Sequence, residues 1–319
     1  MTMPGAARRR LPPEKRWPAG DPSLRAHVHT MTDGARVRVV TGGVPSGRPV
    51  VLLHGWACSA YSFRHLLPAL AAAGYRVAAP DLRGHGLSDK PDDAAAYTAD
   101  ALGAHVAELV ATFGAGDRAP VVIGHSLGGA LTLRLALGAS AAPDAARAGG
   151  APRPSAIVLL NPAGLGPMPL ATIARWLTPR PAAGMLSHVL WRPLFAIVMG
   201  LVRSRADQYT ARDLDEYWAP TAEPAFARAL RHCVHSFDWR PLPADRLRRL
   251  AVPALVVTGT SDQLIGAMVD DWAGWDALAA AGARLVPIRG GRHIVHEEQP
   301  ARVERLVLEF LRETAPPAG

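Results

Sequence analysis

Cysteine is scarce in this sequence, and its scarcity excludes whole classes of protein. The 319 residues include two cysteines, Cys58 and Cys233, which are too few for a disulfide framework and lack the C-x-x-C spacing of metal or redox sites. We therefore expect a reducing, cytoplasmic environment, no bound metal and no other cofactor.

Lysine is also scarce, although the chain is strongly basic. Only Lys15 and Lys90 are lysines among 35 basic residues, and the formal net charge is +8. The arginines are scattered among alanine, glycine and proline, a pattern typical of GC-rich codon usage, whereas nucleic-acid-binding proteins gather basic residues in patches. Because no nucleic-acid-binding motif is present either, we expect no nucleic-acid partner.

Long apolar runs are absent. The most continuous one, LFAIVMGLV at 194–202, is far shorter than the roughly 20 residues that a helix needs to span a bilayer. Residues 1–23 carry positive charge with no apolar stretch behind it, so we expect no secretory signal. The sequence predicts a soluble protein without a transmembrane segment and with a flexible tail at 1–23.

Strand-like and helix-like segments alternate along the chain. Helical patterns lie at 62–74, 98–114 and 302–314, and 35–43 alternates like a half-buried antiparallel strand. The alternation predicts an α/β fold with a mostly parallel central sheet flanked by helices. The apolar runs that predict further strands span 48–55, 75–84, 119–126, 155–162, 253–262 and 283–291.

The alternation breaks once, between 165 and 245. This stretch is helix-like and contains no strand pattern, and structureless loops of that length are rare inside compact domains. We therefore predict an inserted helical cap at 165–245. The core of the α/β domain would be formed by 24–164 and 246–319.

Aromatic residues are few, and four of the eight tryptophans fall in the predicted cap, three of them in its apolar stretches. Trp176, Trp191 and Trp218 are expected to pack within the cap rather than to serve as platforms for a substrate. Ligand sites are mostly apolar clefts with a few placed polar groups. We therefore expect the apolar stretches around Trp191 and Phe195 to line the pocket for the substrate.

The stretch GHSLGG at 124–129 carries the G-x-S-x-G pattern, centred on Ser126. An apolar run precedes it and a helical pattern follows it, which is the context that a sharp strand-to-helix turn requires. The flanking glycines are needed because such a turn leaves no room for side chains. This context predicts that Ser126 is a nucleophile whose oxygen stands above the sheet.

A serine nucleophile needs a base, and the base needs an orienting carboxylate. Asp262 follows the apolar run that begins at 253, and His293 lies in the loop after the last predicted strand, so the chain order is Ser, Asp, His. Two alternatives stay open at this point. Asp238 could take the place of Asp262, and His296 could take the place of His293.

These segments together resemble the α/β-hydrolase superfamily over residues 35 to 315. The resemblance rests on LLHGWACS, DLRGHGLSDKP, GHSLGG, GTSDQLI and GRHIVHEEQP. It implies a nucleophilic Ser126, a basic His293 partnered by Asp262, and a helical cap. It also implies an oxyanion hole formed by the backbone N–H groups of Trp56 and Leu127.

The resemblance predicts a serine hydrolase that cleaves an ester or thioester of a small, largely apolar acid through an acyl-enzyme. Alternatives on the same triad are hydrolysis of a C–C bond and acyl transfer, and a non-catalytic ligand receptor is a further alternative of a different class. Haloalkane dehalogenases and epoxide hydrolases use an aspartate at the elbow, so Ser126 disfavours them. The natural substrate and the oligomeric state stay open.

The remaining histidines near the motifs have simpler interpretations. His54, His85 and His125 flank motif glycines, and we expect them to shape the pocket by hydrogen bonding. The pair in HIVHEE could suggest metal ligands, but the H-E-x-x-H pattern is absent and no third ligand is indicated. We therefore expect no zinc site.

Overall fold

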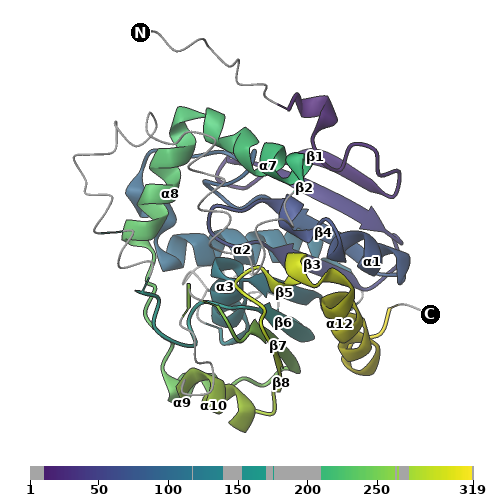
Figure 1. The fold of residues 1–319 in the computed structure, drawn as a ribbon, viewed down its shortest axis with the longest axis vertical. Helices are drawn as coiled ribbons and strands as arrows, with labels where there is room; N and C mark the ends of the chain where they lie inside the picture. Colours follow the sequence, from purple (N-terminus) through teal and green to yellow (C-terminus); the bar gives the residue numbers. More distant parts are fainter. Residues whose placement is uncertain are drawn as a thin grey trace.

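The protein contains one eight-stranded sheet with the order β1-β2-β4-β3-β5-β6-β7-β8 (Figure 1). The structure is a computed structural model that describes residues 11–116, 118–138, 153–169, 175, 210–262, 264–265 and 273–317. The strands are β1 (Leu24–Thr30), β2 (Arg36–Gly43), β3 (Pro49–Leu53), β4 (Arg76–Pro80), β5 (Val121–His125), β6 (Ala156–Leu160), β7 (Ala254–Gly259) and β8 (Arg284–Ile288).

Most of the sheet is parallel. Strands β3 to β8 pair in parallel, and β2 pairs antiparallel with both β1 and β4. The predicted fold class is therefore confirmed, and each of the six apolar runs contains one parallel strand. The expected antiparallel strand at 35–43 is β2, whereas β1 had no strand signal in the sequence.

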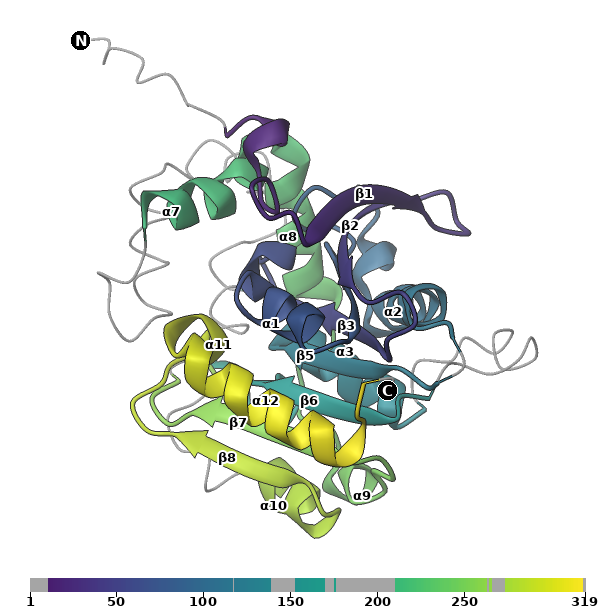
Figure 2. The same cartoon turned by 90° about the vertical axis from the view of Figure 1, so that its right-hand side faces the viewer.

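Helices cover both faces of the sheet. Figure 2 shows α1 and α12 in front of it, and their buried leucine, valine and phenylalanine side chains share one apolar cluster with the strands. Helices α2 and α3 pack on the opposite face. The helices of this core are α1 (Leu66–Ala72), α2 (Ala99–Phe113), α3 (Leu127–Ala136), α9 (Ala244–Leu247), α10 (Ala273–Ala280), α11 (Val295–Glu298) and α12 (Pro300–Thr314), with short 3-10 helices η2 (Ala60–Phe63) and η3 (Ala94–Tyr97).

The long flanking helices follow from their apolar spacing. In α12 the buried residues Val303, Val307, Phe310 and Leu311 recur at the period that places them on one helix face. Proline at position 300 suits the first turn of this helix, where its missing N–H costs no hydrogen bond. The predicted helix at 302–314 is thus confirmed.

Residues 11–23 differ from the flexible tail expected at 1–23. They include η1 (Pro13–Lys15), and the side chain of Trp17 is only 9% exposed. Its ring packs edge-on against Tyr61, and the backbone N–H of Trp17 donates to the Glu216 carboxylate. Contacts with distant parts of the chain therefore hold this segment, whereas residues 1–10 lie outside the described residues.

The described part of the predicted cap is helical. It contains α7 (Ala211–Trp218), η6 (Ala219–Ala222) and α8 (Pro224–Ser236), with Trp218 buried. Trp176, Trp191 and Phe195 lie outside the described residues, so their expected packing is untested. The division of the chain into core and cap stays a prediction.

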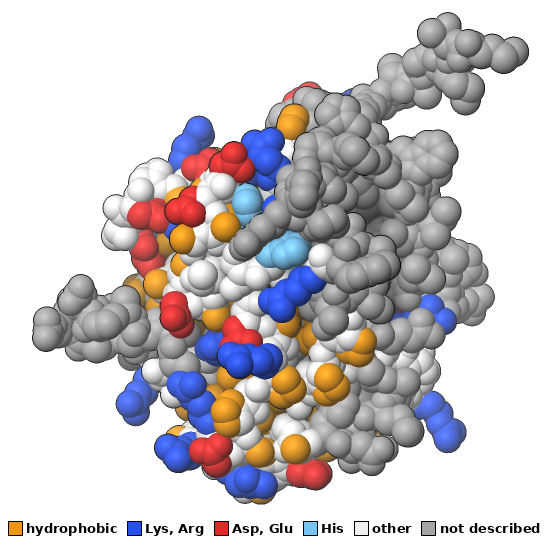
Figure 3. All heavy atoms as spheres, turned by 90° about the vertical axis from the view of Figure 1, so that its left-hand side faces the viewer, with side chains coloured by type: hydrophobic (Ala, Val, Ile, Leu, Met, Phe, Trp, Pro, Cys, Tyr) orange, Lys and Arg blue, Asp and Glu red, His pale blue; other side chains and the backbone are white. Residues whose placement is uncertain are grey.

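Two observations concern the partners that the protein could have. Within the described ranges, no helix is both long enough and apolar enough to cross a membrane. On the face drawn in Figure 3, arginine and lysine side chains are interspersed with aspartate and glutamate side chains. Basic and acidic side chains are therefore mixed on that face.

Candidate active site

Ser126 stands at the turn between β5 and α3. Its backbone adopts φ 50° and ψ −113°, a conformation that costs energy for any residue with a side chain. Hydrogen bonds fix the turn, because its N–H donates to the Leu160 carbonyl and its own carbonyl accepts from Ala130 and Ala163. The turn is held by β6 as well as by α3.

The glycines around Ser126 are required by backbone packing. A Cβ atom on Gly124 would overlap the Gly128 carbonyl, and one on Gly128 would overlap the Leu53 carbonyl at the end of β3. A Cβ on Gly129 would approach the Cβ of Pro162 to 2.6 Å. The motif glycines are therefore required because α3 packs closely against its neighbouring strands.

The structure brings Ser126, His293 and Asp262 together. The His293 Nε2 lies 2.9 Å from the Ser126 Oγ, and its Nδ1 lies 2.7 Å from the Asp262 Oδ2. All three side chains are buried, with Ser126 only 4% exposed. The three residues come from the ends of β5, β7 and β8, which meet at the carboxyl edge of the parallel sheet.

The Asp262 carboxylate determines which nitrogen of His293 carries the proton. Burial alone would raise the pKa of Asp262, but the charge of His293 and the hydrogen bonds to the carboxylate outweigh burial, so this pKa lies below its usual value. An ionised carboxylate only accepts hydrogen bonds, so the Nδ1 of His293 must donate. Its Nε2 is then free to accept the proton of the Ser126 hydroxyl.

Asn161 is a site residue that the sequence analysis missed. It follows β6, adopts φ 42°, and donates from its side-chain amide to the Asp262 Oδ2 at 2.7 Å. Asparagine tolerates this left-handed conformation better than most residues. The only sequence signal was its position near the end of the predicted strand at 155–162.

We expect Asn161→Gly to destabilise the protein at neutral pH by about 1.5–3 kcal/mol, the typical value of a hydrogen bond to a charged group. Glycine keeps the left-handed backbone and removes only the amide. The pKa of Asp262 is lowered in the folded state, so its stabilising contribution is present above the unfolded pKa and lost as pH falls through the folded pKa. The difference in unfolding free energy between wild type and Asn161→Gly should therefore become smaller toward acid pH, as measured by urea denaturation.

Asn161→Ala is the matched comparison for this prediction. It removes the same amide but adds about 1–2 kcal/mol of left-handed strain, so it should be the less stable of the two variants. If Asn161→Gly loses as much unfolding free energy at acid pH as at pH 7, the Asn161 amide does not act by stabilising the charged Asp262 carboxylate.

The loop after β3 approaches Ser126 closely. A Cβ atom on Gly55 would lie 3.1 Å from the Ser126 Cβ, so the loop has backbone in direct contact with the nucleophile. The Cys58 N–H donates to the Gly55 carbonyl, and Ala57 adopts φ 62° within this tight turn. Among the residues that the structure describes, Ala57, Ser126 and Asn161 are the non-glycine residues with positive φ. Backbone strain is thus concentrated at this site.

The N–H groups of Trp56 and Leu127 suit the expected oxyanion hole. Within the described ranges neither N–H has an acceptor, and Leu127 begins α3, whose N-terminus favours negative charge. The Trp56 side chain points elsewhere, because its indole N–H donates to the Leu230 carbonyl of α8 at 3.1 Å. Trp56 thereby connects this loop to the predicted cap.

The three motif histidines make the expected hydrogen bonds. His54 accepts from the Leu82 N–H at Nε2 and contacts the Gly55 carbonyl at Nδ1. Burial lowers the pKa of His85 to about 3, so that ring is neutral. His125 contacts the His293 carbonyl through Nε2 at 3.0 Å. These rings hold the backbone around the site rather than supply a second base.

The two alternative residues contact partners other than Ser126. Asp238 is on the surface, where it pairs with Arg240 at 2.9 Å. The Nε2 of His296 contacts the Ser62 hydroxyl at 2.8 Å. The geometry thus favours Asp262 and His293. In the part of the chain that the structure describes, no group of His, Cys, Asp and Glu side chains is arranged to hold a metal ion.

Comparisons with known proteins agree with the observed fold. The model of the alpha/beta hydrolase family matches residues 50–306. The chain is similar to Epoxide hydrolase A of Mycobacterium tuberculosis, with 29% identity over 88% of this chain and 95% of the relative. It is also similar to a non-heme chloroperoxidase of Streptomyces lividans, with 29% identity over 89% of this chain and 98% of the relative.

A solved structure described as a putative aryl esterase from Burkholderia cenocepacia is similar in three dimensions. It superposes with a TM-score of 0.68 and 25% sequence identity, covering 91% of this chain and 99% of the other. The chemistry named for these proteins differs from one to the next, so the fold does not decide the reaction of this chain.

Proposed function

The chain belongs to the alpha/beta hydrolase family, and we propose that it is a serine hydrolase that cleaves a small, largely apolar ester or thioester through an acyl-enzyme. The observation that carries the proposal is the hydrogen-bonded series from Ser126 through His293 to Asp262. A non-catalytic receptor would need no such series.

In the first half of the reaction, the Ser126 oxygen attacks the substrate carbonyl while the Nε2 of His293 takes the hydroxyl proton. The ionised Asp262 stabilises the imidazolium that forms. Negative charge develops on the former carbonyl oxygen, and we expect the N–H groups of Trp56 and Leu127 to donate to it. His293 then gives its proton to the leaving alcohol or thiol, and an acyl group stays on Ser126.

In the second half, water replaces the leaving group. The water attacks the acyl carbonyl while His293 takes one of its protons. His293 then returns this proton to the Ser126 oxygen when the acid departs. An alcohol that entered instead of water would give acyl transfer by the same steps.

The surroundings of Ser126 support an apolar acyl group. Leu127, which follows Ser126, and Ala163, whose N–H donates to the Ser126 carbonyl, belong to one buried apolar cluster, and Trp56 packs against this cluster. Ligand sites of this kind are mostly apolar with few polar groups. We therefore expect a short or branched hydrocarbon acid to be preferred over a charged one.

The identity of the nucleophile argues against epoxide opening, although an epoxide hydrolase is among the relatives. Attack of a serine oxygen on an epoxide carbon would form an ether. Water activated by His293 has no carbonyl to attack in an ether, so the enzyme would stay alkylated at Ser126 and release no diol. A carboxylate nucleophile would instead form an ester, which water can cleave.

A fluorophosphonate probe is expected to label the wild-type protein at Ser126, as identified by mass spectrometry of the labelled peptide. The protein should also turn over p-nitrophenyl esters, with kcat/KM varying by about 10–200-fold across short and medium acyl chains, as a hydrophobic pocket allows. Styrene oxide should give no enzyme-catalysed diol. Labelling elsewhere, or sustained epoxide turnover without ester turnover, would contradict the proposal.

A further inference from the structure

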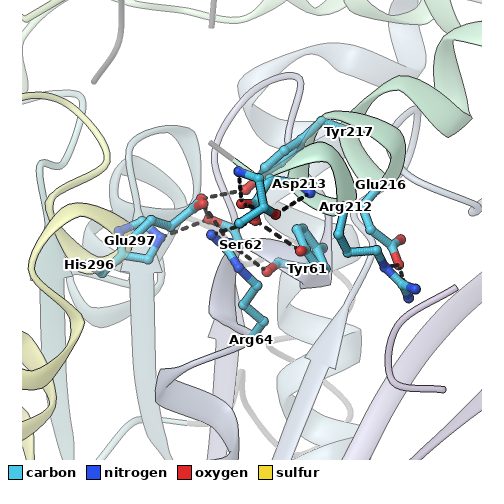
Figure 4. A network of polar contacts seen from close by, with 10 residues as sticks. Tyr61, Ser62, Arg64, Arg212, Asp213, Glu216, Tyr217, His296 and Glu297 are labelled. Atoms are coloured by element: carbon cyan, nitrogen blue, oxygen red, sulfur yellow. Dashed lines mark hydrogen bonds and ion pairs between the residues drawn. The ribbon is translucent and has the colours of Figure 1, made fainter. Parts of the chain in front are cut away.

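A buried cluster of charged and hydroxyl side chains lies beside the candidate site. We call it the Glu297 cluster and define it as Ser62, Arg64, Asp213, Tyr217 and Glu297 (Figure 4). Ser62 lies in η2 and Arg64 directly after it. Asp213 and Tyr217 lie in α7 of the predicted cap, and Glu297 lies in α11, which follows His293. The cluster is separate from the series that links Ser126 to Asp262.

Glu297 is the central acceptor of the cluster. Its side chain is buried, with the residue 5% exposed, and its Oε2 accepts from Arg64 at 2.6 Å. Its Oε1 accepts from the Ser62 hydroxyl at 3.0 Å and from the Tyr217 hydroxyl. Buried charge is costly unless it is paired and hydrogen-bonded, so these donors fix the carboxylate in one position.

The cluster ties α7 to the core at two points. Arg64 pairs with Asp213 of α7 at 2.8 Å in addition to Glu297. Burial and the Glu297 carboxylate raise the pKa of Tyr217 well above its usual value, so its hydroxyl stays protonated and donates from α7 to Glu297. Figure 2 shows α7 and α11 on the same side of the molecule. The position of α7 is thereby connected to that of α11.

The connection continues from α11 to His293. Glu297 lies in α11, a helix of four residues that begins two residues after His293. The His125 ring contacts both the His293 ring, at 5.1 Å between centroids, and the His296 ring, at 4.5 Å. The His293 carbonyl is in turn bound by His125. The His293 loop and α11 are thus packed as one unit against His125.

A single helical turn is not stable on its own, so α11 depends on its tertiary contacts. A displacement of about 1 Å in a reacting group can cost about 10²-fold in rate. We propose that Glu297 is a positioning residue for His293, and that Tyr217 couples α7 of the predicted cap to the base through it. This inference rests on the proposed function, because it assigns a role relative to His293 acting as the base.

Tyr217→Phe tests the inference with the smallest change, since it removes only the hydroxyl that donates to Glu297. We expect fluorophosphonate labelling of Ser126 to slow by about 3–10-fold, a fraction of the penalty for a full 1 Å displacement. The matched control is Tyr75→Phe, which also removes a buried tyrosine hydroxyl, the donor to the Ala315 carbonyl, at the opposite end of the sheet. Labelling rates are measured well below the melting temperature of each variant.

Glu297→Gln and the double variant Tyr217→Phe/Glu297→Gln complete the experiment. Glu297→Gln should label about 10–100-fold more slowly, and the double variant should label at the same rate as Glu297→Gln, because Tyr217 acts only through Glu297. If Glu297→Gln does not fold, Tyr217→Phe and its control decide the question alone.

Three results would overturn the inference. One is a wild-type labelling rate in Tyr217→Phe, even if its melting temperature falls. Another is equal slowing in Tyr75→Phe, which would reflect general destabilisation. The third is the absence of Ser126 labelling in the wild type, which would overturn the proposed function as well. Normal wild-type labelling with an unchanged Tyr217→Phe would overturn the positioning role alone.

Discussion

Ser126→Ala is expected to lower kcat for ester hydrolysis by about 10⁴-fold or more, as removal of a triad nucleophile does in other hydrolases. The variant keeps the His293–Asp262 pair and the N–H groups of Trp56 and Leu127, but no oxygen remains to form the acyl-enzyme. The measurement is the steady-state kcat for a p-nitrophenyl ester, together with the loss of fluorophosphonate labelling.

The fold should survive this substitution. The Ser126 hydroxyl is buried and hydrogen-bonded to His293, so its loss should cost about 1 kcal/mol of unfolding free energy. Ser88→Ala is a matched control, because it removes another buried hydroxyl, the donor to the Asp81 carbonyl, far along the chain from the triad. Near-normal turnover in Ser126→Ala, or an equal loss of turnover in Ser88→Ala, would remove the basis for a serine mechanism.

The parallel strands were predictable from sequence because they are buried on both faces. Every residue of β3, β5, β6 and β7 is buried, so each strand had to be a continuous apolar run. Strand β1 gave no such signal. Among the described strands it lies at the sheet edge beside β2, and it exposes most of its side chains, so its sequence LRAHVHT is not constrained to be apolar.

The nucleophile turn was predictable for a related reason. Gly124, Gly128 and Gly129 are each required by a close backbone or proline contact, so the local sequence carries the constraint directly. Asn161 carries no comparable local constraint. It reaches Asp262 because β6 and β7 are neighbours in the sheet, where the Asn161 N–H also donates to the Val257 carbonyl. A role that depends on strand adjacency cannot be identified before the sheet order is known.

Trp17 and Glu297 illustrate the same limit at longer range. Trp17 contacts Glu216 across 199 positions of the sequence, and Ser62 contacts Glu297 across 235. Their own segments have neither a motif nor a periodic pattern that indicates these partners. The sequence therefore indicated the candidate reacting groups, whereas the side chains that hold these groups in place became visible only in the folded chain.

Asp262→Asn should lower kcat by up to ~10⁴-fold, the loss that follows when a triad histidine is held in the wrong tautomer. The Asp262 Oδ1 faces the N–H groups of Leu264 and Ile265, while its Oδ2 faces His293 and Asn161. An asparagine can accept on one side only. The backbone N–H groups are fixed, so its oxygen is expected to face them and its NH₂ group to face His293. His293 would then accept at Nδ1 and carry its proton on Nε2, where it could not take the Ser126 proton.

The control for this prediction is Asp238→Asn, the same chemical change at the other candidate acid. The Asp238 side chain is 38% exposed and pairs with Arg240, which is more exposed still, so its loss should change kcat by less than about twofold, in keeping with the small contribution of surface ion pairs. Both variants are compared by kcat for one p-nitrophenyl ester, with thermal melting to confirm folding. Because the amide cannot supply the charge that orients His293, raising the pH should not restore turnover in Asp262→Asn. A large loss in Asp238→Asn with little change in Asp262→Asn would mean that Asp238 supports the base, and that the observed contact between Asp262 and His293 is not the catalytic one.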